Sequence, residues 1–168
     1  MNNIKELRKL YNMSQSEFAK RFNISVRTLQ QWEQEKSAPN DALLQAIFEI
    51  YLRENDATEY EIMYKNQTVA DVLLSKDKKY ILSFMKTKNL FMMPFKNNIN
   101  VFDFYRFIKD RCYEDGRDNL NIILNAAKLT SNDPYKWIKI SHGVTWEDYF
   151  WIKEKNENII WKEVRVRE

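Results

Sequence analysis

The chain has 168 residues, 44% of them hydrophobic, which excludes a disordered chain and allows one or two domains with a real core. A single cysteine excludes an internal disulfide, and there is neither an apolar run of about 18 residues nor a signal-peptide pattern, so a cytoplasmic location is expected. The 27 basic and 24 acidic residues leave a net charge of +3, too small by itself to indicate a nucleic-acid partner.

The first predicted element is a helix from about Asn3 to Tyr11, where apolar residues recur at helical spacing with basic residues between them. Ser14 follows as a good N-cap, and Glu17 completes a capping box for a second helix. The apolar face of that second helix consists of Phe18, Ala19 and Phe22.

A tight turn and a third helix come next. Asn23 accepts the left-handed conformation that a turn needs, and Ser25 can cap the following helix. That helix turns Leu29 and Trp32 inward. Its outward positions hold hydrogen-bonding, cationic or small apolar side chains and no acid, namely Val26, Arg27, Thr28, Gln31 and Gln34. Base edges and phosphates accept such groups, so the stretch 13–39 is a candidate DNA-reading helix-turn-helix.

Residues from about Ile4 to Tyr51 resemble the helix-turn-helix of the phage repressor and Cro superfamily, also called the xenobiotic-response-element family. The resemblance rests on the segments Met13-Ser14-Gln15-x-Glu17-Phe18-Ala19 and Ile24-Ser25-Val26-x-Thr28-Leu29-x-x-Trp32-Glu33, followed by Pro39.

Two positions depart from the family pattern. Asn23 replaces the turn glycine, and Glu35 replaces the glycine after the recognition helix, where a side chain makes a left-handed cap less favourable. The resemblance also implies an ion pair between Arg8 and Glu33 that ties the first helix to the recognition helix. The alternative is two unrelated surface charges.

Four residues are candidates for base contacts: Val26, Arg27, Thr28 and Gln31. Arg27 could pair with guanine and Gln31 with adenine, each bidentately and each worth ~1–3 kcal/mol of discrimination, while Val26 or the Thr28 methyl could touch a thymine methyl. The candidates for DNA backbone contacts are Gln15, Ser25, Gln34 and Lys36. Of these, Gln15 matches the family position that holds a phosphate near a helix N-terminus. The alternative is a merely solvated helix face.

Residues 1–55 contain 8 basic and 7 acidic residues, so this head is nearly neutral. A single such head should bind DNA weakly, because non-specific affinity depends on phosphate neutralisation. We therefore expect a homodimer that places two heads on a palindromic operator. A fourth helix, from about Asn40 to Tyr51, should close the small core, and its far end could supply a dimer contact.

The polar segment from Arg53 to Thr58 marks a boundary between a helix-turn-helix domain over 1–55 and a second domain over 58–168, which makes the chain α+β. Alternation over 60–64 predicts a strand, and the further strand candidates, at 69–74, 79–85 and 90–95, suggest a three- or four-stranded meander. Helices are expected from Val101, over the stripe from Leu120 to Leu129, and from Pro134 to Ile140. A closing hairpin is expected from the segments 150–153 and 159–166.

Residues that carry chemistry are sparse in the second domain. Cys112 and His142 are the only thiol and imidazole, and no nucleophile–base set accompanies them, so we expect no catalytic residue, no metal site and no cofactor. Cys112 is most simply a small core residue and His142 a structural turn residue. The tryptophans of this domain, Trp137, Trp146, Trp151 and Trp161, favour a core first, a protein interface second and a small-molecule pocket third.

The run Asp148-Tyr149-Phe150-Trp151, followed by Trp161-Lys162-Glu163-Val164, resembles a segment of persistence-type kinases from toxin–antitoxin modules. No kinase nucleotide loop or catalytic motif accompanies it, so the resemblance implies association rather than chemistry. Two functions remain. One is a dimeric transcriptional repressor that binds double-stranded DNA. The other is an autoregulated antitoxin or inhibitor whose residues 58–168 bind and block another protein. No membrane partner is expected.

Overall fold

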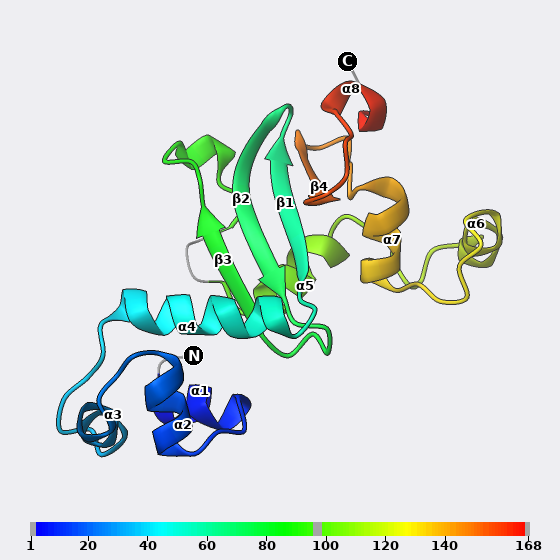
Figure 1. Ribbon diagram of the computed structural model, residues 1–168. Helices are drawn as coiled ribbons and strands as arrows, with labels where there is room; N and C mark the ends of the chain where they lie inside the picture. The colour runs from blue at the N-terminus through cyan, green and yellow to red at the C-terminus, as the bar shows by residue number, and fades with distance from the viewer. Residues whose placement is uncertain (1–2, 96–98, 167–168) are drawn as a thin grey trace. The chain divides into compact units, whose positions relative to one another are not determined.

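The computed structural model describes residues 3–95 and 99–166. The chain divides into two compact units, Met1–Asp56 and Ala57–Glu168, which we call the N-terminal and C-terminal units (Figure 1). Among the described residues no helix is both long and apolar enough to span a bilayer. The arrangement of a helical unit followed by a unit with a four-stranded sheet confirms the α+β fold class.

The N-terminal unit contains four helices in the described part of the chain: α1 (Ile4–Leu10), α2 (Gln15–Arg21), α3 (Val26–Glu33) and α4 (Asp41–Glu54). Each begins at a side chain that accepts a backbone N–H bond, and these caps are Asn3, Ser14, Ser25 and Asn40. The capping box predicted for Ser14 and Glu17 is formed. The core contains the fully buried side chains of Leu7, Phe18 and Leu29.

The first three helices end in the same way. Asn12, Asn23 and Glu35 each lie one residue past the helix cap with a positive φ, at 51°, 52° and 60°. After α2, for example, the N–H of Ile24 donates to the carbonyl of Ala19 at 2.8 Å. This 6→1 bond is the mark of a Schellman motif, which needs the left-handed residue. The turn predicted at Asn23 is thus confirmed.

The sheet of the C-terminal unit has the order β3-β2-β1-β4 and is antiparallel throughout. Its strands are β1 (Thr58–Tyr64), β2 (Gln67–Leu74), β3 (Ile81–Met85) and β4 (Phe150–Glu154). β1 to β3 form the predicted meander, with a register shift between Ile62 and Met63. β4 comes from the end of the chain and pairs with the free edge of β1.

The remaining elements of this unit are η1 (Leu90–Met92), α5 (Val101–Lys109), α6 (Leu120–Ala126), α7 (Pro134–Ser141) and α8 (Trp161–Val164). One sheet face forms the main core with α5 and α7, through Tyr60, Ile62 and Val72 on the strands and Phe104 and Ile138 on the helices. A smaller cluster joins Met63, Trp151 and Trp161.

Two strand predictions in this unit are wrong. Residues 90–95 form no strand, because the side chain of Asn89 caps a 3₁₀ turn by accepting from the N–H of Phe91, and Pro94 has no N–H to donate to a ladder. The closing hairpin is also absent. Phe150–Glu154 pairs with β1, and residues 161–164 form the short helix α8, whose Trp161 is buried.

Most of the tryptophan, histidine and cysteine side chains of this unit are packed or hydrogen-bonded within it. Trp137, Trp151 and Trp161 are buried, whereas Trp146 is 66% exposed. His142 follows α7 in a left-handed conformation, and its Nδ1 lies 3.1 Å from the carbonyl of Ile152. The half-buried Cys112 thiol donates to the Ile108 carbonyl. Burial raises the pKa of this thiol to about 11.

Candidate nucleic-acid interface

The candidate interface is built on α3, whose start is set by Ser25. Its Oγ accepts from the N–H of Thr28 at 2.9 Å and lies 2.7 Å from the Thr28 Oγ1. Leu29 is fully buried and anchors the inner side of the helix. The cap and this anchor leave the opposite side of α3 facing solvent.

The outward side of α3 carries no acidic side chain. Val26 is 39% exposed, and Arg27, Gln31 and Gln34 are also exposed. Thr28 is half-buried, and its hydroxyl is already bonded to Ser25, so its methyl is the group free for a contact. This side therefore offers one cation, two amides and apolar methyl groups. Base edges and phosphates accept these groups.

Glu33, the one acid of α3, points into the protein, with only 5% of its side chain exposed. Arg8 of α1 binds it twice, from Nε to Oε1 at 2.6 Å and from Nη2 to Oε2 at 3.2 Å. The Arg8 Nη1 donates to the Met13 carbonyl at 2.9 Å. The expected ion pair is confirmed, and it joins α1, the turn before α2 and α3.

The charge state of this pair follows from its hydrogen bonds. Burial on its own would raise the pKa of Glu33, but the hydrogen bonds from Arg8 and Gln15 outweigh burial and hold that pKa below its usual value. The hydrogen bond to Glu33 raises the pKa of Arg8. Glu33 is thus a paired carboxylate at neutral pH and leaves the outward side of α3 free of negative charge.

Gln15, expected at the DNA backbone, begins α2 and lies against the same carboxylate. Its Nε2 donates to Glu33 Oε2 at 2.7 Å, and its Oε1 accepts from Gln30 Nε2 at 3.4 Å. Sequence reasoning missed Gln30, an exposed residue of α3 that extends this network. Its contact to Gln15 joins two different helices, so the spacing of residues along α3 does not predict it. The only signal in the sequence was one more glutamine on a helix already rich in glutamine.

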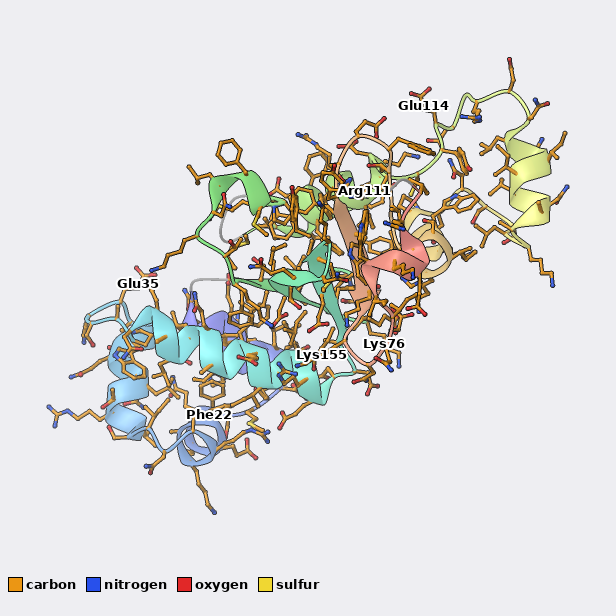
Figure 2. All side chains as sticks on the ribbon, turned by 90° about the horizontal axis from the view of Figure 1, so that it is seen from above. Phe22, Glu35, Lys76, Arg111, Glu114 and Lys155 are labelled. Atoms are coloured by element: carbon orange, nitrogen blue, oxygen red, sulfur yellow. The ribbon has the colours of Figure 1, made fainter. Side chains whose placement is uncertain are left out.

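The loop after α3 adopts the left-handed cap despite lacking glycine. Glu35 has a φ of 60°, and Figure 2 labels it in this loop. The N–H of Lys36 donates to the Gln31 carbonyl at 2.9 Å, and the N–H of Glu35 donates to the Trp32 carbonyl at 3.1 Å. Lys36 is exposed at the C-terminal end of α3. The departure from the family pattern therefore costs backbone strain and leaves the geometry intact.

Comparison with known proteins gives one match, in the N-terminal unit. Residues 4–51 match a family model described as Helix-turn-helix. No curated protein and no solved structure gives a significant match to the chain. The matched residues include α1, α2, α3 and most of α4, together with the Arg8–Glu33 pair.

The order of the helices, the Asn23 turn, the outward side of α3 and the family match agree with one another. Domains of this kind bind DNA in transcriptional regulators, with the second helix of the motif in the major groove. Residues 4–51 are therefore a helix-turn-helix domain of the phage repressor and Cro type.

Proposed function

We propose that the chain is a transcriptional repressor that binds a palindromic operator as a dimer and reads it with α3. The observation that carries the proposal is the outward side of α3, where Arg27, Gln31 and Gln34 are exposed and the only acid of the helix is withdrawn into a pair with Arg8. The guanidinium, amide and methyl groups left on this side are the groups that base edges and phosphates accept.

The proposal assigns two kinds of contact. Val26, Arg27, Thr28 and Gln31 contact base edges, with Thr28 acting through its methyl group. Gln15, Ser25, Gln34 and Lys36 contact the DNA backbone. Gln15 can do so while its amide stays bonded to Glu33, because α2 begins at this residue and the N–H groups of a first helical turn can bind a phosphate.

The dimer follows from charge. Three of the basic side chains of the N-terminal unit are bound to acids within it, in the pairs Arg8–Glu33, Arg21–Glu54 and Arg53–Glu49. The other five basic residues of 1–55 stand beside four further acids, so one head alone should bind weakly. Two heads on half-sites about 34 Å apart supply the missing affinity.

The test is selection of bound duplexes from a random pool by the full chain, followed by footprinting of the selected site. We expect a palindrome with both half-sites protected one DNA turn apart. Binding that shows no sequence preference at 0.15 M salt, or tight binding of a lone half-site by a monomer, would contradict the proposal.

A second candidate function, the autoregulated antitoxin or inhibitor, is favoured by the exposed aromatic residues of the C-terminal unit. Phe91 is 91% exposed and Trp146 66% exposed. Aromatic side chains of this kind are typical anchors of protein interfaces. Capture of a stoichiometric protein partner that is lost on Trp146→Ala and Phe91→Ala would favour this function.

A further inference from the structure

The two outer strands of the sheet, β4 and β3, differ in whether their outward backbone groups are bonded (Figure 1). Along β4, the N–H groups that point away from β1 all have acceptors. Those of Phe150 and Glu154 donate to nearby carboxylates at 2.9 and 2.7 Å. The N–H of Ile152 donates to the His142 carbonyl at 2.8 Å, and the Ile152 carbonyl lies 3.1 Å from Nδ1 of the same histidine. These bonds close the outer edge of β4 to a further strand.

The outer edge of β3 is open. The Tyr80 carbonyl and the Lys86 N–H, just outside the strand, both bond toward the β2 side. The alternation of an antiparallel ladder therefore turns the N–H and carbonyl groups of Ile81, Ser83 and Met85 away from β2. In the described part of the chain, no group bonds to the backbone of these three residues. Such an edge is a template for an extended backbone.

The Ser83 hydroxyl is a second sign of a missing neighbour. Its oxygen is buried and has no hydrogen-bond partner among the described residues. Buried polar atoms are seldom left without one. On a strand added beside β3, the residue opposite Ser83 would have its Cβ about 4.5–5.5 Å away, within reach of a hydroxyl or amide side chain.

Lysines flank β3 at both ends. Residues 75–88 contain five lysines and one acid, so this segment alone is more positive than the whole chain, whose net charge is +3. Figure 2 labels one of them, Lys76, in the turn before the strand. All five are exposed, three before β3 and two after it: Lys76, Lys78, Lys79, Lys86 and Lys88. A segment that pairs with β3 meets positive charge at both of its ends, whichever way it runs.

The acids of this hairpin neutralise only part of that charge. Lys86 pairs with Asp71 at 2.7 Å, and Lys79 lies 3.4 Å from the exposed carboxylate of Asp77. The two acids face five lysines, so the hairpin stays positive and favours a partner that carries acids.

The same charges argue against a second copy of this chain on the edge. A two-fold pairing about Ser83 sets Lys78 of one copy opposite Lys88 of the other, at both ends. Like charges directly opposite one another destabilise a sheet. An acidic segment meets no such repulsion.

We propose that β3 is the docking edge for an extended acidic segment of a partner protein, which joins the sheet as a fifth strand. The backbone groups of Ile81, Ser83 and Met85 pair with the segment, and acids near its two ends meet the lysines. This inference goes beyond the repressor proposal and does not depend on it, because peptide binding is measured without DNA.

The first experiment selects displayed random nine-residue peptides with the full chain as bait and measures their affinities by calorimetry. We expect acidic residues near both ends of the selected peptides and alternating β-branched side chains between them. Selection of peptides without acids, or of none above background, overturns the proposal.

The second experiment tests the backbone pairing. Ser83→Pro removes one outward N–H at a position where an edge strand tolerates proline, and it should lower the affinity for the selected peptide about tenfold or more. Ser83→Ala is the matched control and should lose less affinity, because it keeps the N–H. Circular dichroism melts verify that both variants are folded.

Two versions of the selected peptide test the same pairing on the wild-type chain. Each carries N-methyl groups on alternate residues, so in one version they face β3 and in the other they face solvent. The chain should bind only the second version. Equal binding of the two versions overturns strand addition.

The third experiment reverses the flanking charges. Lys79→Glu combined with Lys88→Glu should weaken binding of the acidic peptide and favour a version whose acids are replaced by lysine. Lys128→Glu, at an exposed position after α6, is the control and should change neither.

Two results would assign the edge to another occupant and overturn the proposal. One is a wild-type dimer in light scattering that becomes a monomer on Ser83→Pro, which gives the edge to a second copy. The other is a Lys79→Glu and Lys88→Glu variant that loses DNA binding while its affinity for the peptide is unchanged, which assigns these lysines to DNA phosphates.

Discussion

The two units of this chain differ in the range of the contacts that specify them. In the N-terminal unit, each helix starts at its own cap, and the first three helices end at a left-handed residue within the same short segment. In the C-terminal unit, the decisive hydrogen bonds join distant segments. Trp151 Nε1 donates to the Lys65 carbonyl across 86 residues, and the N–H of Trp161 donates to Asn66 across 95.

The difference shows which sequence patterns predict the structure correctly. Caps and turns act over three to five residues, so they form wherever their residues occur. The partner of a strand such as β4 depends on which sheet edge is free, and no local signal gives that. The Arg8–Glu33 pair is a long-range contact of the N-terminal unit, and there the family resemblance supplied what local signals lack.

The largest effect is expected from the long-range contacts of the C-terminal unit. Trp151→Ala should lower its free energy of unfolding by about 4 kcal/mol, because a fully buried indole and its bond to Lys65 are both removed. Hydrogen exchange of the β1 and β4 amides in a urea series measures this. Trp146→Ala, at a 66% exposed position, is the control and should change the value by less than about 0.5 kcal/mol. An equal loss of unfolding free energy in the two variants would contradict the stabilising role of the long-range contacts of Trp151.

The second prediction removes a long-range contact of the N-terminal unit. Arg8→Met should destabilise that unit by about 3 kcal/mol, because it leaves the nearly buried Glu33 carboxylate without its cation. The measurement is a urea titration that follows the fluorine resonance of 5-fluorotryptophan at Trp32. Arg21→Met, which breaks the exposed pair with Glu54, should cost less than about 1 kcal/mol. If Arg21→Met lowers the free energy of unfolding as much as Arg8→Met does, burial of the Arg8–Glu33 pair does not explain its effect.

The third prediction tests the outward side of α3. Gln31→Ala should weaken operator binding by about 2 kcal/mol, roughly thirtyfold, and leave non-specific binding nearly unchanged, because a bidentate base contact is lost. Salt-controlled titrations of operator and random DNA give both values. Arg27→Ala is the contrasting variant and should weaken both, since its cation can also reach phosphate. Equal loss on both DNAs for Gln31→Ala would place this residue on the backbone.

The fourth prediction concerns the one helix end of the first three that lacks asparagine. Glu35→Gly should stabilise the N-terminal unit by about 0.5–1 kcal/mol, because glycine adopts the positive φ of this position without the clash of a side chain. Asn23→Gly should gain less, since asparagine already tolerates the left-handed region. The same resonance of Trp32 follows both variants. A loss of stability in Glu35→Gly would mean that the glutamate side chain itself contributes a contact.

The smallest effect is a pH dependence. The pKa of Glu33 is lowered in the folded state from a reference value of 4.5, so its contribution to stability is complete above pH of about 4.5 and is lost as the pH falls through the folded pKa. Hydrogen bonds from Ser14 lower the pKa of Glu17 in the folded state, so the contribution of Glu17 to stability is also lost as the pH falls. Glu33→Gln should therefore show a shallower loss of stability between pH 6 and 3 than the wild type. Parallel curves of stability against pH for the wild type and the variant would show that Glu33 does not contribute to the loss of stability in acid.

The starts of α1 to α5 and of α7, the α+β class and the meander of β1 to β3 could be read from the sequence. Ser14 and Glu17 form their box, Asn23 makes its turn, and Pro134 begins α7, because each signal acts on its own few residues. The DNA-reading side of α3 was proposed from the same kind of pattern. Its individual contacts remain predictions.

Only the tertiary structure decided which segments meet. The apolar pattern at 159–166 suits a strand or a helix, and the free edge of β1 was taken by Phe150–Glu154. The amide of Gln15 meets Glu33 and Gln30 because the start of α2 packs against the second half of α3, which spacing along one helix does not show. Local hydrogen bonds are encoded within a turn of chain, whereas burial depends on every other segment that competes for the same surface.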